Sequence, residues 1–277
     1  MTIRIDAHQH FWRYAPDTHP WIDGSMPALQ RDFLPADLDP LLRAAGFDGC
    51  IAVQARQDVA ETEWLLALAD EHAFIRGVVG WVDLSAPDVD AQLALLTARP
   101  TLRGIRHIAQ DEPDDRFLLR PDFMRGIAAL AQFDLAYDIL IYPRQLPAAA
   151  KLAAAFPKQR FVLDHLGKPP IRGGEIDAWA RGIAALSRNR NVYCKLSGLV
   201  TEADWREWSP DDFAPYLDIA MQWFAPERLM FGSDWPVCTL AGPYLDVTAI
   251  VTRYLDRLAP EARDMILGET AIDFYHL

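Results

Sequence analysis

The sequence predicts an α/β protein in which eight parallel strands, separated by helices, close into a (β/α)8 TIM barrel. Short β-rich apolar runs alternate with segments of helical periodicity almost to the end of the chain, and no long linker interrupts them. The length of 277 residues suits a single barrel domain over residues 1–277. An open, doubly wound sheet would usually place a Gly-rich turn after its first strand, whereas His-Gln-His-Phe-Trp (8–12) stands there.

Eight runs have the length and composition of buried strands. They are residues 3–8, 49–54, 75–82, 104–108, 136–141, 161–165, 192–196 and 229–232. Segments between them repeat apolar residues at three- and four-residue spacing, which is typical of amphipathic helices. The clearest are residues 61–71, 89–98, 122–132 and 146–155. Strands that alternate with helices in this way predict a parallel sheet.

Composition excludes several classes of protein. The formal net charge is -12 and no basic tract is present, so the surface that neutralises nucleic-acid phosphates is missing. No apolar run is long enough to cross a membrane, and the first residues lack the hydrophobic region of a signal peptide; we expect a cytoplasmic, soluble protein. Cys50, Cys194 and Cys238 are odd in number and far apart, which fits reduced thiols.

Polar residues stand at or near the ends of six predicted strands. His8 and His10 lie at the end of the first, and because side chains alternate across a strand, their imidazoles point the same way and can converge on one atom. The others are Arg106 and His107, Asp138, Asp164 and His165, Lys195, and Asp234. The active site of a barrel lies at the C-terminal ends of its strands, so these residues are predicted to form one site.

Several motifs have a recognisable pattern. They are Asp-Ala-His-Gln-His-Phe-Trp (6–12), Gly-Ile-Arg-His (104–107), Asp-His-Leu-Gly-Lys-Pro (164–169), Cys-Lys-Leu-Ser-Gly (194–198), Met-Phe-Gly-Ser-Asp-Trp-Pro (230–236) and Gly-Glu-Thr-Ala (268–271). Over nearly the whole chain the sequence resembles the amidohydrolase superfamily, and within it the sugar lactonase branch of the L-fuconolactonase and L-rhamnonolactonase type. The resemblance implies an amidohydrolase-type, metal-dependent hydrolase fold and the hydrolysis of a cyclic ester in carbohydrate metabolism.

The metal pattern of the superfamily is incomplete here. Many binuclear members carry a bridging Lys or Glu on strand four and a His on strand five, whereas this chain offers Arg106, His107 and Asp138, which argues against a two-metal site. The residues that remain, His8, His10, His165 and Asp234, can hold one zinc ion in an open site. They can equally act without a metal, because the lactonase branch is thought to include enzymes that need no divalent ion.

Lactone hydrolysis assigns a role to each catalytic candidate. Asp234 is predicted to take a proton from the attacking water and to return it to the leaving hydroxyl. His165, together with His8 and His10 or an ion that they hold, would polarise the carbonyl. Arg106 and Lys195 are the permanent cations that would stabilise the oxyanion and the carboxylate product. The predicted reaction opens an L-fucono-lactone-like aldonolactone to the free aldonic acid.

Recognition of a sugar ring needs an apolar wall for its C–H face and polar groups for its edges. The predicted wall is Trp12, Tyr142 and Trp235, and the predicted polar contacts are Gln9, His107, Asp138 and Lys195. Segments 18–31 and 171–179 contain Pro or Gly and follow strand ends, so either can cover the pocket. The partner is a small-molecule sugar lactone, with neither nucleic acid nor membrane; the particular sugar and the oligomeric state cannot be inferred from the sequence.

Two other functions stay open. The superfamily contains zinc-dependent decarboxylases with a similar set of Asp and His residues, which would release carbon dioxide from an unsaturated acid. A catalytically silent sugar-acid binding protein could also keep the fold, although the complete set of His8, His10, His165 and Asp234 argues against it.

Overall fold

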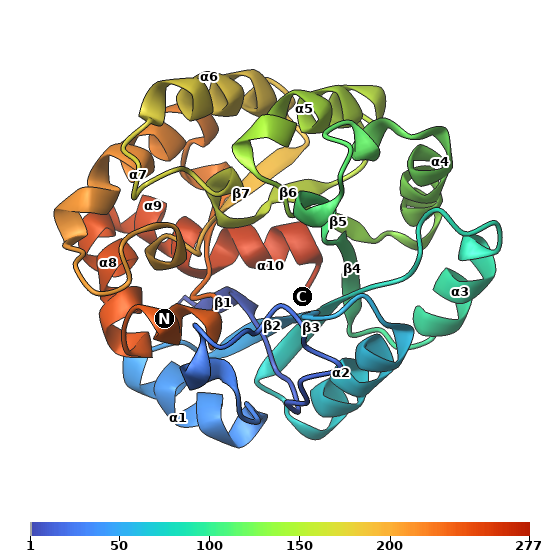
Figure 1. Cartoon of the computed structure of the whole chain (residues 1–277), viewed down its shortest axis with the longest axis horizontal. Coiled ribbons are helices and arrows are strands. Elements are labelled where there is room, and N and C mark those ends of the chain that lie inside the picture. Colours follow the sequence, from blue (N-terminus) through green and yellow to red (C-terminus); the bar gives the residue numbers. More distant parts are fainter. Residues whose placement is uncertain (1) are drawn as a thin grey trace.

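Eight parallel strands form one sheet that closes on itself in the computed structural model, which describes residues 2–277 (Figure 1). The strands are β1 (Ile5–Gln9), β2 (Gly49–Val53), β3 (Ile75–Gly80), β4 (Leu102–His107), β5 (Ala136–Ile139), β6 (Phe161–Leu163), β7 (Val192–Leu196) and β8 (Leu229–Phe231). Each strand pairs with the next in the sequence, and a parallel bridge between Gln9 and Trp235 joins the first to the segment after the last. The barrel prediction is confirmed.

Helices surround the barrel and connect its strands (Figure 1). They are α1 (Pro35–Ala45), α2 (Val59–Glu71), α3 (Val89–Leu96), α4 (Pro121–Leu130), α5 (Leu146–Ala155), α6 (Ile176–Ser187), α7 (Pro210–Phe224), α8 (Tyr244–Leu255), α9 (Pro260–Asp264) and α10 (Thr270–Tyr275). Proline begins α1, α4 and α7, where its missing N–H costs no intrahelical hydrogen bond. None of the helices described in residues 2–277 combines the length and apolar character needed to cross a lipid bilayer.

The inside of the barrel has its own small apolar core. Strand residues such as Ala7, Ile51, Val79 and Val162 pack there, and Phe274 of α10 packs against them. The helix α10 lies across the barrel in Figure 1. Its Tyr275 is buried, and the phenol hydroxyl donates to the Asp138 carboxylate at 2.8 Å. The last helix therefore packs into the barrel beneath the strand ends.

The element boundaries differ from the prediction at two informative places. Strand β6 ends at Leu163 instead of residue 165, because the backbone from His165 to Lys168 turns left-handed and leaves the sheet. The segment 171–179 is not a loop throughout, since α6 begins at Ile176 and buries Trp179. The Trp179 indole N–H donates to the Leu166 carbonyl at 2.7 Å, which fastens α6 to that turn.

Candidate active site

A cavity of about 430 Å³ opens at the C-terminal ends of the strands. Five residues predicted from the sequence line it: His10, Arg106, Tyr142, His165 and Asp234. Loop residues complete its walls, among them Trp21, Asp111, Lys168, Thr201, Glu202 and Trp205. Segment 18–31, one of the two predicted covering segments, contributes Trp21 to the lining.

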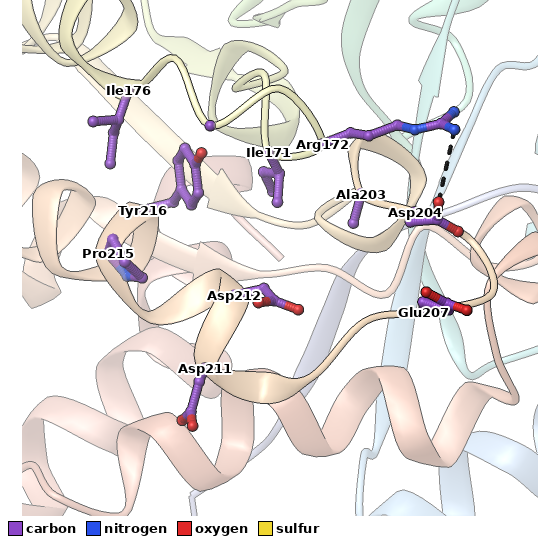
Figure 2. Close-up of a pocket in the computed structure, with 11 residues that line it drawn as sticks. Ile171, Arg172, Ile176, Ala203, Asp204, Glu207, Asp211, Asp212, Pro215 and Tyr216 are labelled. Atoms are coloured by element: carbon purple, nitrogen blue, oxygen red, sulfur yellow. Dashed lines mark ion pairs between the residues drawn. The ribbon is translucent and has the colours of Figure 1, made fainter.

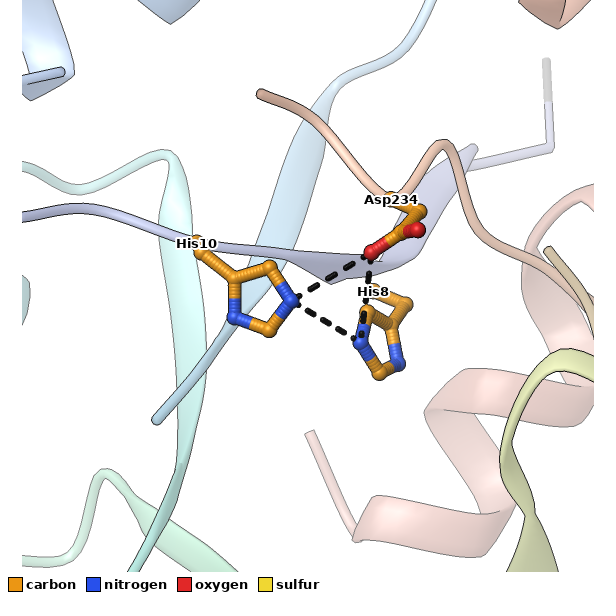
Figure 3. A group of neighbouring side chains, drawn as sticks. All are labelled: His8, His10 and Asp234. Carbon is orange, nitrogen blue, oxygen red and sulfur yellow. Dashed lines mark hydrogen bonds and ion pairs between the residues drawn. The ribbon is translucent and has the colours of Figure 1, made fainter. Parts of the chain in front are cut away.

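His8, His10 and Asp234 converge beside this cavity (Figure 3). The two Nε2 atoms of His8 and His10 lie 3.2 Å apart, and Oδ1 of Asp234 is 3.4 Å from His10 Nε2 and 3.9 Å from His8 Nε2. The Nε2 atom of His165 approaches the same carboxylate oxygen at 4.0 Å. Three imidazoles thus face one carboxylate, as the strand positions predict.

The spacing of these atoms fits a single zinc ion. Tetrahedral ligands at the usual Zn–N and Zn–O distances lie about 3.3 Å from one another, close to the separations among His8, His10 and Asp234. Because the Val53 carbonyl accepts a hydrogen bond from His10 Nδ1 at 2.8 Å, the Nε2 atom of that ring keeps its lone pair for a metal. These three residues therefore fit a zinc ion, and His8 also belongs to a second group of possible ligands with Asp164 and His165.

Arg106, Asp138, Asp164 and Lys195 form a buried ion cluster below His8. Lys195 Nζ lies 2.5 Å from the Asp138 carboxylate, 3.0 Å from the Asp164 carboxylate and 3.2 Å from His8 Nδ1. Arg106 pairs with the other oxygen of Asp164 at 3.0 Å and reaches His8 Nε2 at 3.3 Å. Two cations and two carboxylates balance inside the barrel, and they hold the His8 ring from beneath.

Burial and charge set the protonation states of the site. Burial would raise the pKa of Asp234, but the neighbouring His165 and the hydrogen bond from His10 outweigh it and hold that pKa below its usual range. Burial lowers the pKa of His165 to about 4, so this ring is neutral at pH 7. Burial would also raise the pKa of Asp164, yet Lys195 and His8 keep it well below the ordinary value. At neutral pH, the Asp234 carboxylate therefore faces the neutral ring of His165.

The backbone at the end of β6 is left-handed over four consecutive residues. The φ angles are +52° at His165, +53° at Leu166, +68° at Gly167 and +54° at Lys168. This conformation costs about 1–2 kcal/mol for each residue other than glycine. Neighbouring Gly198 also has a positive φ of +63°, and a Cβ there would meet the His165 ring at 2.6 Å. The glycine is needed for the ring to sit where it does.

Other predicted substrate-binding residues lie outside the cavity lining. Trp12 and Trp235 pack in the core, because both rings contact Phe33 with centroid separations of 5.3 and 5.2 Å. Gln9 follows His8 on β1, and His107 follows Arg106 on β4. Because adjacent strand residues point to opposite faces, the side chains of Gln9 and His107 point away from the cavity. The Gln9 amide lies 3.3 Å from Cys50 Sγ, and His107 stacks on Phe117. Asp138 and Lys195 are fully buried in the ion cluster.

Sequence reasoning missed several residues that the structure brings to the site. Asp164 was predicted to lie at the strand end with His165 but was given no role, and the structure pairs it with Arg106 and Lys195. Lys168 and Glu202 line the cavity and were not identified. Trp21 and Trp205 supply aromatic lining in place of Trp12 and Trp235. Loop residues of this kind follow no periodic pattern.

Comparison with known proteins gives a consistent match. A model of the amidohydrolase family matches residues 5–277. The chain is 42% identical to an L-fucono-1,5-lactonase of Burkholderia ambifaria, with 100% of this chain and 97% of the relative covered. It is 44% identical to an L-fucono-1,5-lactonase of Burkholderia multivorans, with 99% and 96% covered. Both relatives act on the class of substrate that the sequence motifs imply.

A solved structure has nearly the same fold as this chain. The crystal structure of an amidohydrolase from Burkholderia multivorans with bound zinc superposes with a TM-score of 0.94 at 44% identity, and 99% of each chain is covered. A metal ion therefore binds a protein of the same fold and similar sequence.

Proposed function

Because this chain belongs to the amidohydrolase family, we propose that it is a lactonase that opens sugar lactones of the L-fucono-1,5 type to the free aldonic acids. The observation that carries the proposal is the Asp234 carboxylate, which faces the rings of His8, His10 and His165 at the wall of an accessible cavity. A strained cyclic ester needs a positioned water, a base and a group that polarises the carbonyl, and this cluster supplies each of them.

The charges of the cavity favour a neutral substrate. Among the described lining residues, Arg106 is paired with Asp164, and Lys168 lies 3.7 Å from Glu202. A substrate with several carboxylates would need unpaired cations, whereas Asp111 and Asp234 add negative charge to the lining. An uncharged polyhydroxy lactone meets no such conflict, which supports a sugar lactone over an unsaturated acid awaiting decarboxylation.

Asp234 acts as the general base. Its lowered pKa keeps it ionised at neutral pH, so it can accept a proton from a water that attacks the lactone carbonyl. After the tetrahedral intermediate collapses, the protonated Asp234 returns that proton to the ring oxygen that leaves as a hydroxyl. The products are one carboxylic acid and one hydroxyl on the same open chain.

His165 polarises the carbonyl in this proposal. Its Nδ1 lies 2.9 Å from the Ser197 hydroxyl. When that hydroxyl donates to Nδ1, the ring proton resides on Nε2, the atom nearest Asp234, where it can donate to the substrate oxygen. Arg106 lines the same cavity and adds the positive charge that stabilises the developing oxyanion.

One zinc ion would be held by His8, His10 and Asp234, with Asp164 near His8 Nδ1 at 3.4 Å as an outer acceptor. When bound, the ion would supply Lewis-acid polarisation of the ester carbonyl. The protein groups described above keep their positions and roles around it.

Acid release from a panel of aldono-1,4- and 1,5-lactones, followed with a pH indicator, tests the proposal. The protein is first stripped with a chelator, and each assay is repeated with added zinc. We expect turnover of L-fucono-type lactones that is lost in Asp234→Asn. No acid release with or without zinc would reject the lactonase, and carbon dioxide release from unsaturated acids would support the decarboxylase instead.

A further inference from the structure

The left-handed turn after β6 carries a second side chain into the cavity besides His165. Lys168 stands at the other end of this turn, and its backbone N–H donates to the His165 carbonyl at 2.8 Å. Both side chains line the cavity. A φ of +54° is strained for lysine, and strained backbone is found mostly at functional sites. The conformation therefore indicates that the placement of the Lys168 side chain in the cavity has a function.

Lys168 faces an acidic partner from a different strand end. Its Nζ lies 3.7 Å from Oε1 of Glu202, which is longer than a hydrogen bond, and 5.3 Å from the centre of the Tyr142 ring. Both charged side chains are mostly buried, with 17% and 21% of their surfaces exposed. A direct hydrogen bond would commit one ammonium donor and one carboxylate acceptor to each other, whereas this separation leaves both free to bind a third group between them.

The loops that carry the pair are fixed to each other. The Arg172 backbone N–H donates to the Glu202 carbonyl at 3.0 Å, which joins the segment after β6 to the segment after β7. Within the second segment, the Trp205 indole N–H donates to the Thr201 carbonyl at 3.0 Å. The two loops are therefore held together through their backbones, which keeps both side chains within reach of one ligand.

We propose that Lys168 and Glu202 are the specificity pair of this enzyme, which binds the ring hydroxyls of a neutral sugar lactone between an ammonium donor and a carboxylate acceptor. The inference rests on the proposed lactonase function and goes beyond it by assigning where the ring hydroxyls bind. A hydroxyl accepts from Lys168 and donates to Glu202 at once, and Tyr142 and Trp205 offer aromatic surface to the C–H face. The ester group meanwhile faces Asp234 and His165.

The chain contains a matched control. Arg172 and Asp204 join the same two loops as an ion pair, also 3.7 Å apart, and Figure 2 shows them beside a neighbouring hollow. Neither residue lines the cavity that contains Asp234. Their side chains are 76% and 43% exposed. Removing this pair disturbs the loop connection without touching the cavity.

The test compares two substrates in four proteins. Wild type, Lys168→Met, Glu202→Gln and Arg172→Met are assayed with L-fucono-1,5-lactone and with δ-valerolactone, which has the ester but no ring hydroxyls. We expect the two cavity variants to lose about 10–100-fold in kcat/KM for the sugar lactone, mostly through KM, because hydroxyl-binding sites reject substrates they cannot pair with. Their rates with δ-valerolactone, and both rates of Arg172→Met, should stay within about 2-fold of wild type.

Each result supports or overturns the specificity pair. Equal losses with both substrates would assign Lys168 and Glu202 a structural or catalytic role instead and would overturn the inference, as would unchanged rates with both. Lys168→Arg, which keeps a cation in the cavity, should recover part of the loss with the sugar lactone alone. If wild type opens neither lactone, the proposed lactonase function fails, which is distinct from failure of the specificity pair alone.

Discussion

Two sets of polar residues lie close together at the strand ends and differ in nearly every physical respect. The buried ion cluster of Arg106, Asp138, Asp164 and Lys195 has its two cations and two carboxylates paired within the barrel. Asp234 and His165 instead meet an accessible cavity, and their oxygen and nitrogen stay 4.0 Å apart. Asp138, Asp164 and Lys195 pair with one another away from the cavity, and Arg106, which pairs with Asp164, alone of the four also lines the cavity; Asp234 and His165 face the cavity and remain available to a ligand.

Backbone geometry follows the same division. Arg106, Asp138 and Lys195 lie within strands, where the extended backbone is unstrained. His165 and Asp234 come after their strands and have φ angles of +52° and +59°. Within these two sets, the strained residues are the two that face the cavity, where stored strain can have a functional purpose.

The largest expected effect is the loss of activity when Asp234, which faces the cavity, is replaced. Asp234→Asn removes the base and should lower kcat/KM for a sugar lactone by about 10²–10⁴-fold, the usual contribution of a general base. Asp111→Asn, a second carboxylate of the cavity lining, is the control and should retain activity.

Removing a member of the buried ion cluster should lower the stability of the folded protein. Lys195→Met leaves Asp138 and Asp164 facing each other inside the barrel without their shared cation. Removing one partner of a buried ion pair typically costs about 3–5 kcal/mol, measured as the free energy of unfolding in urea. The pKa of Asp138 is already raised to about 6 by burial, against the opposing charge of Lys195.

The sign of the pH dependence follows from that raised pKa. A carboxyl whose pKa is higher in the folded protein binds more protons there than in the unfolded chain, so its contribution to stability is lost as pH rises from about 4 upward. In Lys195→Met the opposing cation is gone, so the deficit relative to wild type should grow between pH 5 and pH 8. A deficit independent of pH would mean that lost packing, and not charge, explains the variant.

A smaller effect is expected at the bottom of the buried cluster. Tyr275→Phe deletes the hydroxyl that donates to Asp138 at 2.8 Å and leaves the ring in place. The loss should be about 1–3 kcal/mol, because a buried carboxylate oxygen loses a donor. Calorimetry can measure it, and unchanged activity would show that the support is structural.

The smallest effect concerns strain in the cavity. Lys168→Gly removes the steric cost of a φ of +54° but adds backbone freedom to the unfolded chain, so we expect a net gain of about 0.5–1 kcal/mol. Lys168→Met, which keeps the strained backbone, is the control. A Gly variant less stable than the Met variant would show that this turn carries no strain.

The strand ends were predictable because composition and alternation are local. Strand β7 and helix α5 have the predicted bounds, and His8, His10 and Asp234 were predicted to converge from their places on the first and last strands. Alternation also explains two misplacements. Gln9 follows His8 on β1 and His107 follows Arg106 on β4, and the side chains of adjacent strand residues point to opposite faces.

The depth of a side chain within the barrel was not predictable. Lys195 and Asp138 occupy strand positions like those of cavity residues, yet Lys195 lies against His8 and Asp138 against Tyr275 of α10, inside the barrel. The cavity walls depend on loops such as those bearing Trp21 and Glu202, which carry no periodic signal. The left-handed turn at His165 is likewise specified by tertiary contacts, including the Trp179 hydrogen bond to the Leu166 carbonyl.

The most direct test of the central claim is the opening of L-fucono-1,5-lactone in H2¹⁸O, with Asp234→Asn as the reference for uncatalysed hydrolysis. We predict that wild type accelerates the loss of lactone well above the variant and places one ¹⁸O atom in the product carboxylate, as attack of water on the carbonyl requires. A wild-type rate equal to that of Asp234→Asn would contradict the account.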